Sequence, residues 1–192
     1  PDQLKRDNAD MSKVLPVVLS SDSTYAFLAL LGDKYFLFNR DENAFIMYGV
    51  SGRSWVAMGD PVGPKAEWSE LIWRFREICD QYNGWPVFYE VRAENLYLYL
   101  DIGLSVVKIG EEGRVYLRDF SLEGGANKNL RYTARKLEKE GYNFRIIPKE
   151  DINLFLVEFK IISDAWLKNK STREKGFSLG FFDEKYLRNF PA

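Results

Sequence analysis

A set of basic side chains is spaced so that it falls along one face of a helix. The set comprises Lys128, Arg131, Arg135 and Lys139, at steps of three, four and four residues. The same helix is expected to begin after Gly124-Gly125, where free backbone N–H groups and the helix dipole favour an anion. The pattern predicts a phosphate-binding face. A merely solvated face stays an equal alternative, because Glu138 and Glu140 dilute the charge.

A second basic stretch follows a long helical pattern. It carries four basic residues among eight positions, namely Lys168, Lys170, Arg173 and Lys175. Such a stretch at the flexible exit of a helix can steer a polyanion. In isolation it is more often a solvated tail.

Any proton transfer in this chain would fall to Asp, Glu, Tyr or Lys side chains, or to the substrate itself. The chain has no histidine and one cysteine, Cys79, so Ser-His-Asp and Cys-His schemes and zinc clusters are excluded. Cys79 lies in an apolar helical pattern and is expected to be a buried thiol. Asp60, in Gly59–Pro64, either caps a turn or acts as a functional carboxylate at a strand end, and turn chemistry is favoured.

Composition indicates a globular protein with an uneven charge. The chain has 192 residues, is 46% hydrophobic and carries a formal net charge of −1. That length suits one domain with a sizeable core, or two very small ones. Residues 126–175 hold 12 Lys+Arg and 7 Asp+Glu, a net of +5, so the rest carries −6. The basic part can attract polyanions although the whole chain is near neutral.

The first half of the chain predicts a sheet rich in aromatic residues. Four antiparallel strands are expected, as two hairpins: Tyr25–Leu31 with Lys34–Asn39, and Ala44–Val50 with Ser54–Met58. A fifth strand is expected at Pro86–Glu90. Apolar spacing predicts helices at Asp2–Leu15, Lys65–Tyr82 and Glu94–Ile102.

The second half predicts more strands and two helices. Strands are expected at Ser105–Ile109, Val115–Phe120 and Tyr142–Ile147, and helices from Lys128 to Gly141 and over Asp151–Leu167, the latter mainly for packing. The aromatic stretch Phe177–Phe190 must pack on something. No window is long and apolar enough to span a membrane, and the start at Pro1 suggests a fragment.

This order of elements resembles the GNAT acyltransferase fold, named for the general N-acetyltransferases. Three stretches, Val56–Gly63, Phe120–Arg131 and Ile162–Leu187, resemble the cytosolic domain of the bacterial MprF-type phosphatidylglycerol lysyltransferases. The resemblance implies an α/β (α+β) fold with a mixed, mostly antiparallel sheet and helices on both faces. It also implies that residues 1–160 are a first GNAT-like domain. Residues 161–192 would be a basic joining helix and the start of a truncated second half.

The resemblance implies transfer of lysine, or another amino acid, from aminoacyl-tRNA to the phosphatidylglycerol headgroup. The reaction would need no metal or cofactor, would occur at the cytoplasmic face of the bacterial inner membrane, and would alter membrane charge and resistance to cationic peptides. Implied partners are aminoacyl-tRNA, the anionic lipid and the missing second half. The apolar C-terminal stretch also suggests a homodimer of the fragment. The residues implied to contact tRNA phosphate are Lys128, Arg131, Arg135, Lys168, Lys170, Arg173 and Lys175. Phe181 departs from the family, which usually has arginine there.

Two other functions stay open on the sequence. One is an ordinary GNAT enzyme using acetyl-coenzyme A, which would want a tighter loop than Glu123–Ala126, and Glu123 would repel pyrophosphate. The other is a non-catalytic half-domain that docks tRNA or its own missing partner, which the apolar C-terminal stretch favours.

Overall fold

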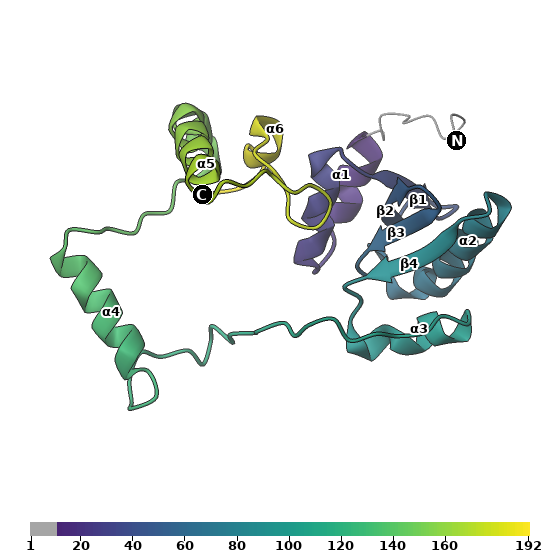
Figure 1. Cartoon of the computed structure of the whole chain (residues 1–192), viewed down its shortest axis with the longest axis horizontal. Helices are drawn as coiled ribbons and strands as arrows, with labels where there is room; N and C mark the ends of the chain where they lie inside the picture. Colours follow the sequence, from purple (N-terminus) through teal and green to yellow (C-terminus); the bar gives the residue numbers. More distant parts are fainter. Residues whose placement is uncertain (1–10) are drawn as a thin grey trace.

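A computed structural model describes residues 11–192 and contains a four-stranded sheet (Figure 1). The strands, in the order β1-β2-β3-β4, are β1 (Tyr35–Phe38), β2 (Phe45–Ser51), β3 (Ser54–Met58) and β4 (Trp85–Tyr89). The β1–β2 and β2–β3 pairs are antiparallel and the β3–β4 pair is parallel. The expected mixed, mostly antiparallel sheet is therefore confirmed.

Helices precede, cover and follow this sheet. The α-helices are α1 (Met11–Leu19), α2 (Trp68–Gln81), α3 (Leu96–Asp101), α4 (Lys128–Lys139), α5 (Leu156–Lys170) and α6 (Glu184–Leu187). The 3-10 helices are η1 (Thr24–Leu31), η2 (Lys65–Glu67), η3 (Ala93–Asn95) and η4 (Lys149–Leu154). In residues 11–192 none of them is both long and apolar enough to cross a membrane.

The two faces of the sheet bury two separate hydrophobic clusters. Side chains alternate along β2, so Ile46 and Tyr48 face one cluster while Phe45 and Met47 face the other. The first cluster packs against α2 and α3 through Leu71, Ile72, Phe75 and Tyr99. The second packs against α1 and η1 through Val14, Val18, Ala26 and Ala29. The expectation of helices on both faces is thus confirmed.

The sequence predicted a strand at Tyr25–Leu31, and this prediction is wrong. The stretch belongs to the 3-10 helix η1. Its sequence TYAFLALL is apolar without strict alternation, and a short apolar run of this kind does not separate helix from strand. Gly32, with φ +69°, ends it, and β1 then pairs with β2 instead. The helix predicted over Asp2–Leu15 lies partly outside the described residues, and its described part belongs to α1.

The three strands predicted for the second half are also wrong. Ser105–Ile109, Val115–Phe120 and Tyr142–Ile147 join no strand of the sheet within residues 11–192. They belong to the segment between α3 and η4, residues 102–148, which is called the excursion below. The excursion leaves α3, carries α4 at its far end and returns to α5 (Figure 1). β-propensity describes fit to a half-buried pleated surface. These segments meet no such surface, because Val107, Leu117 and Phe144 are 77%, 82% and 91% exposed.

The helix predicted at Asp151–Leu167 is formed by η4 and α5, but it packs less than expected. Ile152 and Leu156 are buried, whereas Ile162 and Trp166 on the same predicted stripe are exposed. The aromatic C-terminal stretch does pack on the rest of the chain, as expected. The Phe190 ring lies 5.2 Å from that of Phe27, edge to face.

Candidate functional site

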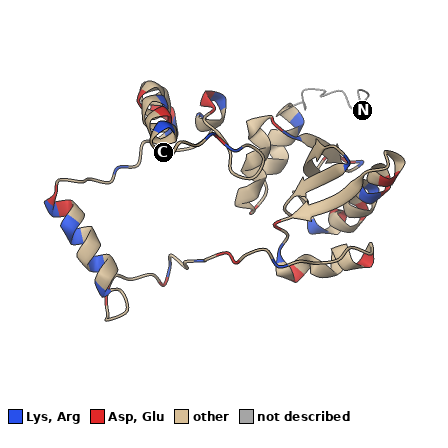
Figure 2. Cartoon of the chain, viewed as in Figure 1, with Lys and Arg blue, Asp and Glu red and all other residues tan. Residues whose placement is uncertain are grey.

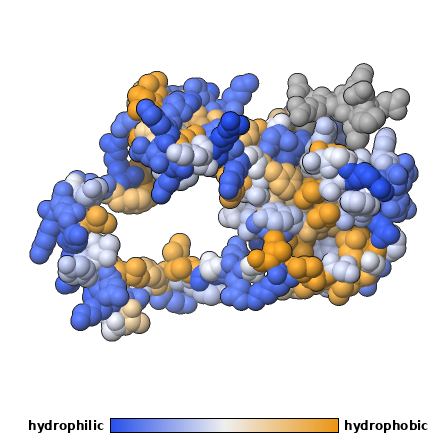
Figure 3. Space-filling view, in the orientation of Figure 1, coloured by the Kyte–Doolittle hydropathy of each residue, from blue (hydrophilic) through white to orange (hydrophobic). Residues whose placement is uncertain are grey.

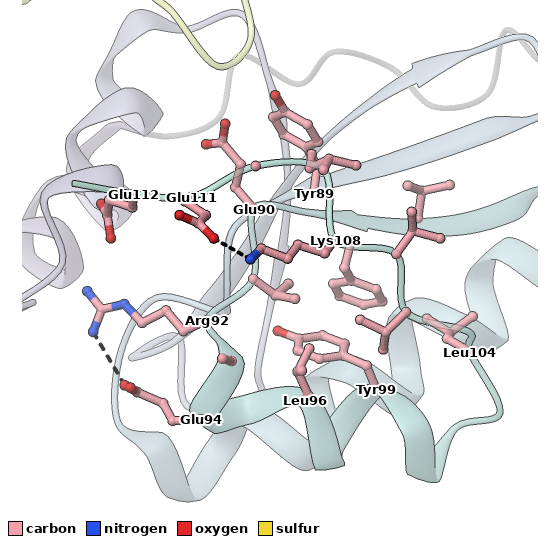
Figure 4. A pocket seen from close by; sticks show the side chains of 18 of the residues that line it. Tyr89, Glu90, Arg92, Glu94, Leu96, Tyr99, Leu104, Lys108, Glu111 and Glu112 are labelled. Carbon is pink, nitrogen blue, oxygen red and sulfur yellow. Dashed lines mark hydrogen bonds and ion pairs between the residues drawn. The ribbon is translucent and has the colours of Figure 1, made fainter.

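A pocket of about 1100 Å³ lies between β4 and the segment Leu104–Glu112 (Figure 4). β4 is an edge strand, and its inner backbone groups bond to β3 and the residues around it. Trp85 N donates to Arg53 O and Tyr89 O accepts from Gly59 N, both at 2.7 Å. Because backbone groups alternate along a strand, those of Pro86 and Phe88 point away from β3, toward the pocket.

The inner wall of the pocket is apolar and aromatic. Leu96 and Tyr99 from α3 and Leu104 from the segment after α3 line it (Figure 4), together with Val106. The Phe88 and Tyr99 rings lie 4.7 Å apart, which joins the strand to the helix beneath it. The pocket therefore offers an apolar interior beside a strand edge that is unpaired within residues 11–192.

The rim of the pocket carries charges in pairs. Arg92 lies 3.8 Å from Glu94, Lys108 lies 2.5 Å from Glu111, and Arg114 lies 2.8 Å from Glu112. The hydrogen bond and charge of Arg114 lower the pKa of Glu112. With Glu90 included, four glutamates face three cations, a net of −1. A phosphate is thus not favoured at this rim.

Asp60 ties the end of β3 to the start of α3. Its Oδ1 accepts from the Tyr99 hydroxyl at 2.6 Å, while its Oδ2 accepts from Asn95 Nδ2 at 2.9 Å and from Arg92 N at 3.2 Å. Burial and then the Asp60 charge raise the pKa of Tyr99 strongly, so its hydroxyl stays protonated and donates. Asn95 Oδ1 is buried with no partner among the described residues. In this geometry Asp60 acts as a structural clamp between segments.

The first predicted basic face lies on α4, far along the excursion (Figure 2). Lys128 and Arg135 are exposed there. Arg131 instead turns back to the loop before the helix, where its guanidinium donates to Leu122 O and to Gly124 O, the latter at 2.8 Å. Arg131 therefore holds the glycine turn in place through these hydrogen bonds. It would influence a bound ligand by fixing that loop.

The second predicted group lies at the end of α5 and in the loop that follows. Lys168 and Lys170 occupy the last turn of the helix, which ends at Ser171 with φ +46°. Arg173 and Lys175 come next, and all four side chains are exposed. The structure thus places the seven predicted residues on two separate segments of the chain, α4 and the α5 exit.

Sequence reasoning missed the pocket. Its charged rim follows β4 as the run Glu90–Glu94, and alternating charges after an apolar strand were the available signal. The position of Leu104–Glu112 opposite β4 had no such signal, because it depends on contacts distant in sequence.

Comparisons with known proteins agree with this architecture. Residues 18–192 match the sequence family described as "Phosphatidylglycerol lysyltransferase, C-terminal". The phosphatidylglycerol lysyltransferase of Bacillus subtilis (strain 168) is 39% identical over 164 residues, which cover 85% of this chain and 19% of that protein. The enzyme of the same name from Staphylococcus aureus (strain MRSA252) is 35% identical over 160 residues, 83% of this chain and 19% of that one. The chain spans about a fifth of the length of these relatives.

Two solved structures share the fold. The C-terminal domain of a putative lysylphosphatidylglycerol synthetase from Agrobacterium fabrum superposes with a TM-score of 0.91 at 36% identity. L-PGS from Bacillus licheniformis superposes with a TM-score of 0.87 at 35% identity. Each match covers 95% of this chain and 58% of the other. The chain therefore belongs to the family of phosphatidylglycerol lysyltransferase C-terminal domains.

Proposed function

We propose that this chain is part of an aminoacyltransferase that moves lysine, or another amino acid, from aminoacyl-tRNA to phosphatidylglycerol. The observation that carries the proposal is the match of residues 18–192 to the lysyltransferase family. The activity belongs to a longer protein, since relatives with that name are matched over 19% of their length.

The proposed reaction exchanges one ester for another. A headgroup hydroxyl oxygen attacks the aminoacyl carbonyl carbon, the bond from that carbon to the tRNA ribose oxygen breaks, and the hydroxyl proton ends on that ribose oxygen. Nothing is oxidised or reduced. Such a step depends on positioning and on stabilising the transient oxyanion, and a chain without histidine is compatible with it.

The exposed basic residues are the proposed contacts for the tRNA donor. The predicted tRNA-contacting cations at the α5 exit are Lys168, Lys170, Arg173 and Lys175, and on α4 they are Lys128 and Arg135. Each contact to phosphate releases counterions, so binding should weaken steeply with salt. The transferred lysine would add positive charge to an anionic lipid surface, which supports the proposed effect on cationic peptides.

The proposed partner of the excursion is a second GNAT-like half. Figure 3 shows hydrophobic residues gathered along the segment between α3 and α4. In this segment Val107 and Leu117 are exposed. Contiguous exposed apolar surface usually marks an interface. The match covers 58% of each solved chain, which leaves room for such a half in those proteins. In the isolated chain, a second copy of the same chain is the alternative partner that would cover this apolar surface.

In this proposal residues 1–160 form the first GNAT-like domain, and residues 161–192 contain the joining helix and the start of the second half. The work would take place at the cytoplasmic face of the bacterial inner membrane. Both substrates support that location, because the donor is a tRNA and the acceptor a membrane lipid.

Charge reversal at the α5 exit tests the tRNA part of the proposal. Lys168→Glu with Lys170→Glu should weaken binding of lysyl-tRNA and lower its salt slope by about two, since two phosphate contacts disappear. Arg40→Glu with Lys65→Glu, at two exposed sites away from α4 and the α5 exit, is the control, because this pair changes the total charge by the same amount. Equal binding and an equal salt slope in the double variant would remove these lysines from the site.

A further inference from the structure

The segment Glu174–Phe182, called the clip below, connects the basic α5 exit to the sheet. We infer that Asp33 and Lys34 are positioning residues, which hold the clip on the sheet and so fix Arg173 and Lys175 where a polyanion can bind. The identity of that polyanion as tRNA rests on the proposed function, whereas the clip itself rests on contacts in the structure.

One carboxylate joins the two parts of the chain. Asp33 Oδ1 accepts from Lys34 Nζ at 2.6 Å, and Asp33 Oδ2 accepts from the backbone N–H of Phe177 at 2.8 Å. Lys34 also donates to Leu28 O at 3.2 Å. Because an ionised acceptor makes a stronger hydrogen bond than a neutral one, Asp33 is a firm anchor for the clip.

Lys34 is buried at the junction. Its side chain has no exposed surface, and burial lowers its pKa. The ammonium lies 5.7 Å from the centre of the Phe177 ring. The negative face of the ring attracts the cation at this distance. A buried ion pair is a weak source of stability but can specify one geometry. Here it specifies where Phe177 lies.

Phe177 has a backbone conformation that side chains rarely adopt. Its φ is +67°, which costs a bulky residue conformational energy unless its surroundings hold it. Its ring lies against Gly49 of β2, where an added Cβ would come within 3.3 Å of the ring. The sheet therefore provides a seat for the ring, and the Asp33 bond to the backbone completes the attachment.

The clip is closed on itself beside the basic residues. Glu174 Oε1 accepts from Phe182 N at 2.9 Å, which joins the two ends of the segment. Gly176 passes so close to Asp33 that an added Cβ would lie 3.2 Å from Oδ2. Arg173 and Lys175 flank Glu174 in sequence, so their backbone is carried by this closed loop. Release of Phe177 from Asp33 would leave both cations without a fixed position.

Limited trypsin cleavage after Lys175 tests the clip without any ligand. Asp33→Asn should speed cleavage of the Lys175–Gly176 bond roughly tenfold, because the ionised acceptor for Phe177 N is lost and the loop opens more often. Phe177→Ala, which keeps the ion pair, should do the same. Asp41→Asn, the same change in the exposed β1–β2 turn, should leave the rate unchanged. Equal rates in all four proteins would overturn the clip.

A double-mutant cycle with tRNA tests the positioning role. Asp33→Asn should weaken binding of lysyl-tRNA by the chain and lower its salt slope by about two. In a chain that already carries Arg173→Gln and Lys175→Gln, the same change should have no effect. An equal loss of affinity in both backgrounds would mean general damage to the fold and would contradict positioning.

The two proposals fail in different ways. If the unchanged chain binds no tRNA while trypsin still distinguishes Asp33→Asn from Asp41→Asn, the proposed tRNA contacts of this chain are wrong and the clip stands. If tRNA binds and the cycle shows no coupling, the positioning role is wrong and the proposed function is unaffected.

Discussion

At the scale of single residues, Cys79 shows how burial controls chemistry in this chain. The thiol projects from α2 into the core and has no exposed surface, as the sequence predicted. Burial raises its pKa from 9.0 to about 12, so it is neither a nucleophile nor a ligand at neutral pH. Burial likewise raises the pKa of Tyr48 from 10.0 to about 12.

These shifts predict that stability falls above pH 9. The unfolded thiol loses its proton above pH 9.0 and the folded thiol does not until about 12, so the folded state binds more protons in between. The free energy of unfolding should therefore drop by about 1.4 kcal/mol between neutral pH and pH 10 from this group alone. Urea denaturation of Cys79→Ala should show a shallower fall between pH 9 and 10. An identical pH dependence in both proteins would contradict the assignment.

Asp60 is the residue for which the sequence left two readings. Both of its oxygens accept hydrogen bonds, from Arg92, Asn95 and Tyr99. In Asp60→Asn the new side-chain NH2 would face a donor and that hydrogen bond would be lost. The free energy of unfolding should therefore fall by about 1–3 kcal/mol. Chemical denaturation measures this, with Asp101→Asn at the exposed end of α3 as control. Unchanged stability together with lost transfer in the longer protein would favour the functional carboxylate instead.

At the scale of elements, the junction between α2 and β4 is tightly packed. A Cβ added at Gly84 would lie 2.5 Å from Trp55, whose ring is stacked 5.5 Å from Tyr48 and 5.5 Å from Tyr82. Gly84→Ala should therefore lower the unfolding free energy by about 1–3 kcal/mol through overpacking.

The matched control is Gly110→Ala, where an added Cβ meets no atom within 4 Å in the part of the chain that the structure describes. Thermal melting of the two variants compares the sites directly. If Gly84→Ala and Gly110→Ala have the same melting temperature, the aromatic stack can shift at little cost. The packing explanation of this junction would then be wrong.

How far the sequence predicts each element depends on how local its cause is. β2, β3 and α2 follow from alternating or helical apolar spacing, so they were predicted closely. Ser105–Ile109 has the composition of a strand, but strand formation requires a partner that composition does not name. Among site residues, spacing placed the basic face of α4. It did not foresee that Arg131 would bond to its own loop.

At the scale of the whole molecule, the chain combines a packed sheet body with an excursion that has little cover. Hydrophobic clusters stabilise the body on both sides of the sheet. On the excursion, in contrast, Leu117 and Phe144 are 82% and 91% exposed. The clip attaches the loop after α5 to the sheet body. This arrangement supports the proposed function, in which further protein covers the excursion and takes part in catalysis.

Transfer of labelled lysine from lysyl-tRNA to phosphatidylglycerol vesicles tests that account most directly. The 192-residue chain is assayed beside a longer family member that contains the same region. We expect label to enter the lipid with the longer protein and not with this chain alone. Transfer by this chain alone would contradict the need for further protein. No transfer by either, together with binding of acetyl-coenzyme A by this chain, would contradict the lysyltransferase assignment itself.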